Sequence, residues 1–167
     1  RCVGCSACVI ACKTENKVPL GSFRDWIEEE LMGEFPNLHM EIRSNRCQQC
    51  DNPPCVTACP TGASYVGEGG VTLVNPDKCT GCKACVVSCP YNARYIHPQG
   101  HIDKCTFCLH RAVKGLKPAC VTVCPTNSLT FGNRNDPKSE ISQTLKDPKI
   151  KRLKEETGCE PNLFFLI

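Results

Sequence analysis

Sixteen of the 17 cysteines in this chain fall into four groups with closely related spacing. Every group begins with C-x2-C and ends with C-x3-C, and three of the four are followed directly by proline. The groups are Cys2, Cys5, Cys8 and Cys12; Cys47, Cys50, Cys55 and Cys59; Cys79, Cys82, Cys85 and Cys89; and Cys105, Cys108, Cys120 and Cys124. A repeat of this kind constrains the fold more than any other feature of the sequence.

The spacing favours iron–sulfur cubanes over other uses of cysteine. The first and third groups read C-x2-C-x2-C-x3-C, and the third, with the proline after it, is the run typical of bacterial ferredoxins. Structural zinc sites use C-x2-C pairs separated by a dozen or more residues, a form that only the fourth group approaches. Disulfides fit poorly because the number of cysteines is odd. The sequence therefore predicts four [4Fe-4S] clusters, with Cys159 left as a spare thiol.

Composition excludes several other classes of function. Aromatic residues form only 6 % of the chain, so we expect cluster ligation to contribute much of what an apolar core usually supplies. A net charge of +3 indicates no nucleic-acid partner. No apolar run approaches the roughly 18 residues of a membrane helix, so no direct membrane span is expected. The sequence shows no nucleophile with a base and no phosphate-binding loop, so we expect no catalytic site.

The segment between the second and third groups predicts how the modules are arranged. Residues 63–66 and 71–74 are β-prone runs on either side of residues 67–70, a glycine-rich hairpin signal. The hairpin brings the two groups together in an inner module, residues 47–95. By elimination, the first and fourth groups form an outer module, residues 1–17 and 96–135. The expected fold is α+β, with two interleaved bacterial two-cluster ferredoxin-like modules, small β-hairpins, short helices and little regular secondary structure.

The connecting insertion, residues 18–46, is expected to pack over a cluster, with a docking surface as the alternative. Its apolar residues are spaced first as in a short helix or hairpin and then as in a strand: Trp26, Ile27, Leu31, Leu38, Met40 and Ile42.

The C-terminal helix and tail form the last segment, residues 136–167. Asp136 and Pro137 predict an N-cap and first residue of a short helix with Ile141 and Leu145 on one face. The ending PNLFFLI predicts either a strand on this domain or a contact with another subunit.

The fourth cysteine of each group is expected to bind the neighbouring cluster. In two-cluster ferredoxins the fourth cysteine ligates the other cluster, and the proline after it cannot continue a helix. The predicted ligands are Cys2, Cys5, Cys8 and Cys124 for cluster 1; Cys47, Cys50, Cys55 and Cys89 for cluster 2; Cys79, Cys82, Cys85 and Cys59 for cluster 3; and Cys105, Cys108, Cys120 and Cys12 for cluster 4.

Basic residues near these ligands are candidates for tuning the clusters. A positive charge beside a cluster favours its reduction, although each such residue is equally expected to be an exposed, solubilising one. The candidates are Lys83, Lys104, His110, Arg111 and Lys114.

Motifs over nearly the whole chain resemble one family of iron–sulfur subunits. CDNPPCVTACPTGAS, DKCTGCKACVVSCPYNARY, DKCTFCLHR, PACVTVCPT and NDPKSEIS are similar to the four-cluster subunits of the molybdopterin oxidoreductase (DMSO reductase) family. KTENKVPLGSFRDWI and EFPNLHMEIR look most like the polysulfide reductase type, followed by the thiosulfate, tetrathionate and arsenate reductase types. Some relatives replace one cysteine of the third group and carry a three-iron cluster. Since this chain keeps all four, we expect four cubanes.

The resemblance implies a role and a setting. It implies a non-catalytic subunit that passes electrons between an integral membrane quinone-interacting anchor subunit and a molybdenum or tungsten bis-pterin catalytic subunit. The complex is expected on the periplasmic or outer face of the membrane after folded export with its partner, with the cytoplasmic face as the alternative. Relatives begin with a strand before the first group, so a strand partner for residues 129–131 is expected before Arg1. The alternative functions are an electron-transfer subunit of a hydrogenase or formate dehydrogenase, and a zinc-stabilised interaction protein.

Overall fold

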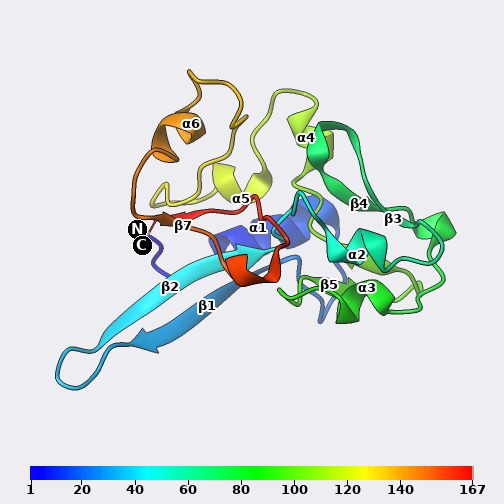
Figure 1. Ribbon diagram of the computed structural model, residues 1–167, viewed down its shortest axis with the longest axis horizontal. Coiled ribbons are helices and arrows are strands. Elements are labelled where there is room, and N and C mark those ends of the chain that lie inside the picture. Colours follow the sequence, from blue (N-terminus) through cyan, green and yellow to red (C-terminus); the bar gives the residue numbers. More distant parts are fainter. Residues whose placement is uncertain (167) are drawn as a thin grey trace.

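Four two-stranded antiparallel sheets supply the β structure of residues 1–166, the part of the chain that the computed structural model describes. Short helices separate them, so the fold is a mixed one with little regular secondary structure, as predicted (Figure 1). The sheets pair β1 (Asp25–Met32) with β2 (His39–Arg46), β3 (Ser64–Val66) with β4 (Thr72–Val74), β5 (Arg94–Ile96) with β6 (Ile102–Lys104), and β7 (Ile150–Lys151) with β8 (Phe165–Leu166).

Every cysteine group carries its third cysteine as the second residue of a helix. These helices are α1 (Ala7–Asn16), α2 (Pro54–Thr57), α3 (Ala84–Val87) and α5 (Ala119–Thr122). The last three are single turns that stop before the fourth cysteine, because the proline that follows lacks an N–H and disfavours helix in the residue before it. The remaining short elements are α4 (Leu109–Ala112), α6 (Glu140–Thr144) and the 3-10 turns Glu68–Gly70, Pro76–Lys78 and Glu155–Thr157.

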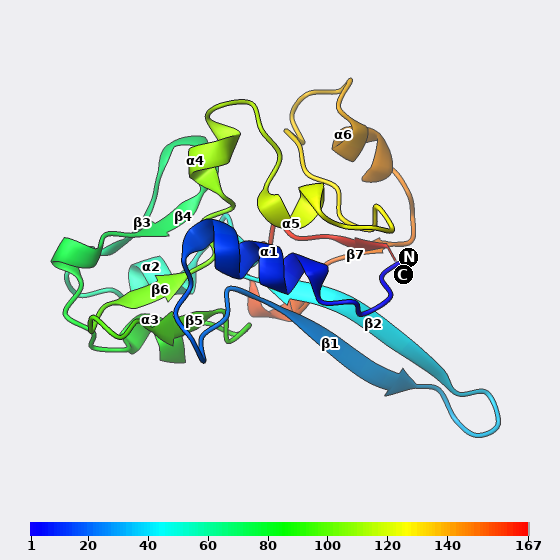
Figure 2. The same ribbon diagram turned by 180° about the vertical axis from the view of Figure 1, so that it is seen from behind.

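The four cysteine-bearing helices lie in two pairs. Helix α1 packs against α5, and α2 packs against α3 (Figures 1 and 2). The first group therefore lies beside the fourth and the second beside the third. The predicted module boundary between residues 95 and 96 falls inside β5.

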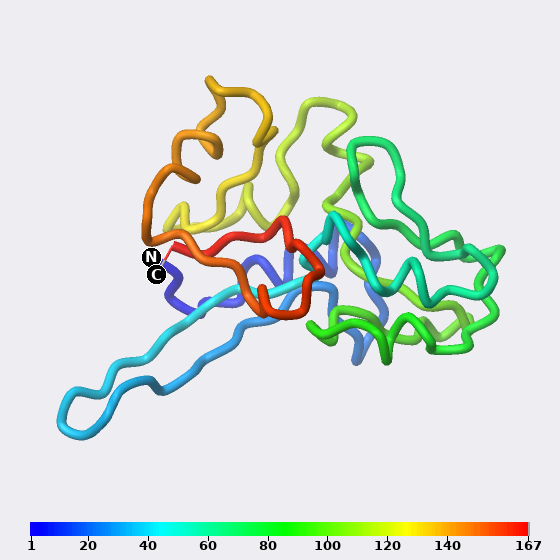
Figure 3. Tube along the Cα trace, viewed as in Figure 1, coloured from blue at the N-terminus to red at the C-terminus, as the bar shows by residue number. Residues whose placement is uncertain are grey.

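The insertion forms a long hairpin that projects from the body of the molecule (Figure 3). Its free end is exposed, with 88 % of Phe35 accessible to solvent. Its base is buried: Asp25 on β1 lies opposite Arg46 on β2, and both are enclosed. The predicted strand-like alternation is confirmed as β2, and the base of the hairpin delivers polar side chains into the body.

The hairpin of β3 and β4 is confirmed, with Ser64 opposite Val74. The hairpin of β5 and β6 was not predicted, because three-residue strands carry too little periodicity to be recognised. It forms around Ile102, which is 1 % exposed and packs with Cys55 and Cys85.

The predicted start of the C-terminal helix is wrong by three residues. Helix α6 begins at Glu140, and Ser139 is its N-cap, accepting a hydrogen bond from the backbone N–H of Ser142 at 3.2 Å. Asp136 instead closes a local turn, in which its carboxylate accepts from the N–H of Lys138 at 2.9 Å. Asx turns of this kind compete with helix capping. Within PNLFFLI, β8 is a strand on this domain, and Ile167 lies outside the described residues.

Candidate iron–sulfur cluster sites

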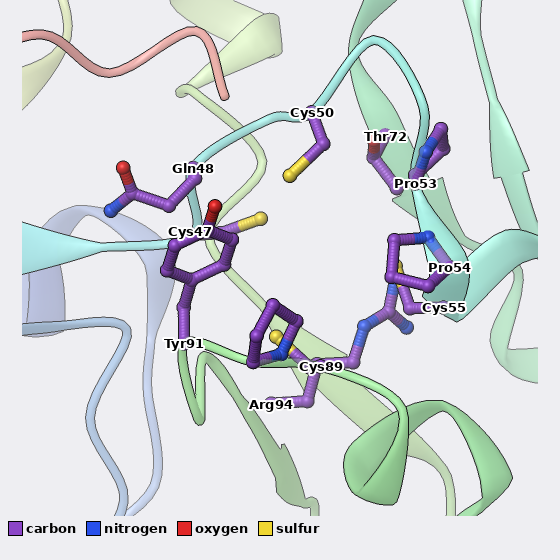
Figure 4. Close-up of a pocket in the computed structure, with 11 residues that line it drawn as sticks. Cys47, Gln48, Cys50, Pro53, Pro54, Cys55, Thr72, Cys89, Tyr91 and Arg94 are labelled. Carbon is purple, nitrogen blue, oxygen red and sulfur yellow. The ribbon is translucent and has the colours of Figure 1, made fainter. Parts of the chain in front are cut away.

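One enclosed cavity is lined by four cysteines from two groups: Cys47, Cys50, Cys55 and Cys89. Three of them follow β2 or lie on α2, and Cys89 follows α3. Figure 4 shows their sulfur atoms around the same space. Burial, together with the neighbouring thiols, raises the pKa of Cys50 to about 12. These four residues are the set predicted for cluster 2.

The cavity also presents a buried nitrogen without a protein partner. Nη2 of Arg94 donates hydrogen bonds to Sγ of Cys55 and Oγ of Ser64, each at 2.8 Å. Nη1 of the same side chain is buried and has no hydrogen-bond partner among the described residues. Four thiols and an unsatisfied N–H in one cavity fit a cubane, because its sulfides are negatively charged acceptors.

The third group meets the last cysteine of the second. Burial raises the pKa of Cys85, and the thiols of Cys59 and Cys79 raise it further, while Arg94 opposes them. Backbone N–H groups already point at two of these sulfurs at 3.3 Å, from Ser64 to Cys59 and from Ile102 to Cys79. Such N–H groups stabilise a thiolate.

Cys12 lies with the fourth group. The side-chain amide of Asn16 is 3.7 Å from Sγ of Cys12 and 3.7 Å from Sγ of Cys108. Burial raises the pKa of Cys12, and the thiols of Cys105, Cys120 and Cys108 add to the effect.

The surroundings of Cys124 favour the thiolate form of its side chain. Burial raises its pKa, but hydrogen bonds from the hydroxyl and N–H of Ser128 outweigh this and lower the pKa to about 7. Of its predicted partners, Cys8 is buried and Cys5 is exposed. The grouping of Cys124 with Cys2, Cys5 and Cys8 stays a prediction.

Buried cysteines of neighbouring predicted sites share clusters of packed side chains, and these shared clusters link the four sites in sequence. Cys8 lies in one cluster with Cys120, Cys105 packs against the cluster that contains Cys47, and Cys55 lies in one cluster with Cys85. In terms of the predicted clusters, these contacts give the order 1, 4, 2, 3.

Two buried arginines near the thiols were missed in the sequence. Arg46 is 5 % exposed and Arg94 is 6 % exposed. One signal for Arg46 was available in the sequence. A basic residue directly precedes the first cysteine of both the second and the fourth group, Arg46 before Cys47 and Lys104 before Cys105.

Of the five basic candidates named from the sequence, Lys104 alone is buried, at 1 % exposed. Its ammonium donates to the carbonyl oxygens of Thr72 and Cys105. His110 and Arg111 pair with Glu15 at the surface.

Two features are absent from residues 1–166. No three His, Cys, Asp or Glu side chains there converge as around a single metal ion. No helix there has the length and apolar character needed to cross a membrane.

Comparison with known proteins identifies the family. Two models described as "4Fe-4S dicluster domain" match, one over residues 38–134 and one over residues 1–63. The chain belongs to this family of 4Fe-4S dicluster proteins. Two dicluster domains imply four [4Fe-4S] clusters, which agrees with the sixteen grouped cysteines.

Relatives align over almost the full chain. A polysulfide reductase chain of Wolinella succinogenes is 46 % identical over 99 % of this chain and 88 % of its own length. Protein NrfC of Escherichia coli is 47 % identical over 98 % of this chain and 75 % of its own length. A tetrathionate reductase subunit of Salmonella typhimurium is 41 % identical over 99 % and 68 %. The protein is thus an iron–sulfur electron-transfer subunit and not a catalytic one.

Proposed function

We propose that this subunit carries electrons between an integral membrane subunit that handles quinone and a molybdenum or tungsten bis-pterin catalytic subunit. The terminal substrate is proposed to be of the polysulfide, thiosulfate, tetrathionate or arsenate type. The observation that carries the proposal is a series of three clusters of packed side chains, each shared by cysteines of two neighbouring predicted sites, from Cys8 with Cys120 to Cys55 with Cys85. The similarity to the polysulfide reductase chain over 99 % of this sequence supports the choice of complex.

The two ends of this series differ from its middle. The exposed cysteines are Cys5 and Cys82, which belong to predicted clusters 1 and 3. Clusters 4 and 2 have buried thiols such as Cys108 and Cys50. A subunit that relays electrons needs accessible clusters only where its partners dock, so the exposure supports exchange at the two ends.

We further propose the crossed ligation predicted from the spacing. The shared cavity of Cys89 with Cys47, Cys50 and Cys55 supports it in the inner module. The contacts of Asn16 with Cys12 and Cys108 support it in the outer module. When bound, a cubane accepts or releases one electron. The chain's own residues position it through thiolates and donate hydrogen bonds to its sulfur ligands.

The complex is proposed to be membrane-associated, on the periplasmic or outer face. The test is to purify the tagged subunit from its native host in mild detergent and to identify the proteins that accompany it. A pterin-containing large subunit and a membrane subunit are expected, together with about sixteen iron and sixteen sulfide atoms per chain, four for each cubane. Adding a quinol to isolated membranes should reduce the clusters, as seen by EPR. A hydrogenase or formate dehydrogenase as the partner would overturn the choice of complex, and zinc without sulfide would overturn electron transfer.

A further inference from the structure

Four charged side chains are buried in residues 1–166: Asp25, Arg46, Arg94 and Lys104. Burying a charge costs several kcal/mol in typical proteins, so these four require a local reason. All of them lie where thiols of two different sites meet.

Arg46 lies where Cys8 meets Cys120. Its Nη1 donates a hydrogen bond of 2.8 Å to Sγ of Cys120. Its Nη2 contacts Oγ of Ser44, which is 3.5 Å from Sγ of Cys8. One arginine and one serine therefore span the third cysteines of the first and fourth groups.

Arg94 repeats this arrangement where Cys55 meets Cys85. It donates to Sγ of Cys55 and to Oγ of Ser64, and its charge acts on Cys85. Again an arginine and a serine lie beside the third cysteines of two groups. Because the third cysteine stays with its own group in any ligation scheme, the parallel does not depend on crossed ligation.

Lys104 lies beside Cys105 at the remaining junction, where Cys105 comes close to Cys47. It is held by two carbonyl oxygens, of Thr72 and Cys105, rather than by a carboxylate. Each of the three junctions thus contains one buried cation.

The junction at Arg46 alone also contains a buried carboxylate. Oδ2 of Asp25 lies 3.3 Å from Nη2 of Arg46, and Asp25 is 2 % exposed. No ion pair joins Arg94 or Lys104 to a carboxylate among residues 1–166. A buried charge is poorly screened, so a neutral pair and an uncompensated cation act very differently on nearby redox centres.

We propose that the buried arginines set the potentials of the clusters on either side of them, and that Asp25 lowers those of the outer module by cancelling the charge of Arg46. Arg94, without a carboxylate partner, holds the potentials of the inner module higher. These are positioning and tuning residues, and they do not bind the iron. The inference rests on the proposed electron-transfer function and adds the residues that shape its energy profile.

The test is an EPR-monitored redox titration of the cluster-loaded protein in its complex. Asp25→Asn should raise the potentials of the outer clusters, and Arg94→Gln should lower those of the inner clusters. We expect at least a tenfold change in the one-electron equilibrium constant, which corresponds to about 59 mV. Signals are assigned to modules by separate Cys12→Ser and Cys89→Ser variants, since Cys12 and Cys89 belong to different modules.

Further variants separate charge from structure. The double change Asp25→Asn with Arg46→Gln removes a neutral pair, so the outer potentials should return close to the unaltered values. Arg94→Lys keeps the charge, so it should shift the inner potentials much less than Arg94→Gln. Arg43→Gln is the matched control, because Arg43 lies on the same hairpin in partly exposed ion pairs with Glu30 and Glu41, makes no contact with a thiol among residues 1–166, and should change no potential.

Two results would overturn the inference. One is unchanged outer potentials in an Asp25→Asn protein that retains all its iron. The other is an equal shift for Arg94→Lys and Arg94→Gln, which would assign the effect to geometry. If Arg94→Gln loses iron, Asp25→Asn and the double variant still decide the question. Failure of the proposed function is distinguishable, because it would appear in the unaltered protein, as missing cubane signals or as a different set of accompanying subunits.

Discussion

Asn16 donates its side-chain amide to Sγ of Cys108, which lies 92 residues further along the chain, at a distance of 3.7 Å. The same amide reaches Sγ of Cys12 at 3.7 Å. One side chain therefore spans sulfurs of the first and the fourth cysteine group. The contact defines the first prediction.

Replacing Cys12 with Ser should disturb the cluster of Cys105, Cys108 and Cys120. The serine oxygen is a poorer iron ligand than a thiolate, so that cluster should lose iron or shift in potential, as EPR would detect. Cys124→Ser is the matched control and should disturb the other outer cluster. Identical spectra for the two variants would contradict crossing in the outer module.

Replacing Cys89 with Ala tests the same rule in the inner module. Its sulfur lines the cavity of Cys47, Cys50 and Cys55, so the cluster held by those residues should be altered. The comparison is Cys59→Ala, which should alter the cluster of Cys79, Cys82 and Cys85. EPR of the reduced protein, or a structure of the loaded variant, distinguishes the two. The crossed scheme is wrong if Cys89→Ala perturbs the cluster of its own group.

Cys159 should not bind iron, although it is buried in the same cluster of side chains as the predicted ligands Cys47 and Cys50. Its side chain is 4 % exposed. Cys159→Ser should retain the full iron content, measured by chemical analysis. Stability should fall by about 1–3 kcal/mol, because the serine hydroxyl is more polar than a thiol in an apolar site. Cys159→Ala isolates the loss of volume. A loss of about four iron atoms, one cubane, would show that Cys159 is a ligand.

Removing the clusters should unfold most of the chain. The buried core consists largely of predicted ligand thiols with few apolar neighbours, and metal binding in small domains is coupled to folding. Circular dichroism followed during anaerobic chelation should collapse together with the visible absorption of the clusters. Native secondary structure that survives complete iron loss would contradict this prediction. The control is the same chelator saturated beforehand with ferrous iron, which should leave both signals unchanged.

The local pattern of the sequence was sufficient to predict the cluster type and the four groups. Thiols within a few residues can reach the same cubane only at particular spacings, so C-x2-C-x2-C-x3-C carries the information by itself. The hairpin between the second and third groups was also predictable, since residues 67–70 are rich in glycine, which accepts positive φ. These features depend on neighbours along the chain.

Only the tertiary structure decided where the buried charges lie. Asp25 and Arg46 are partners because the hairpin register places them opposite each other, and Arg94 reaches Cys55 across 39 residues. In the sequence, each is one charged residue among many, because burial results from contacts between distant segments and leaves no local pattern. The start of α6, by contrast, was decided locally between two candidate caps, since Asp136 closes a turn and Ser139 caps the helix. Spacing thus determined which metal centres the chain can hold, and the packing of distant segments determined the electrostatic environment of each.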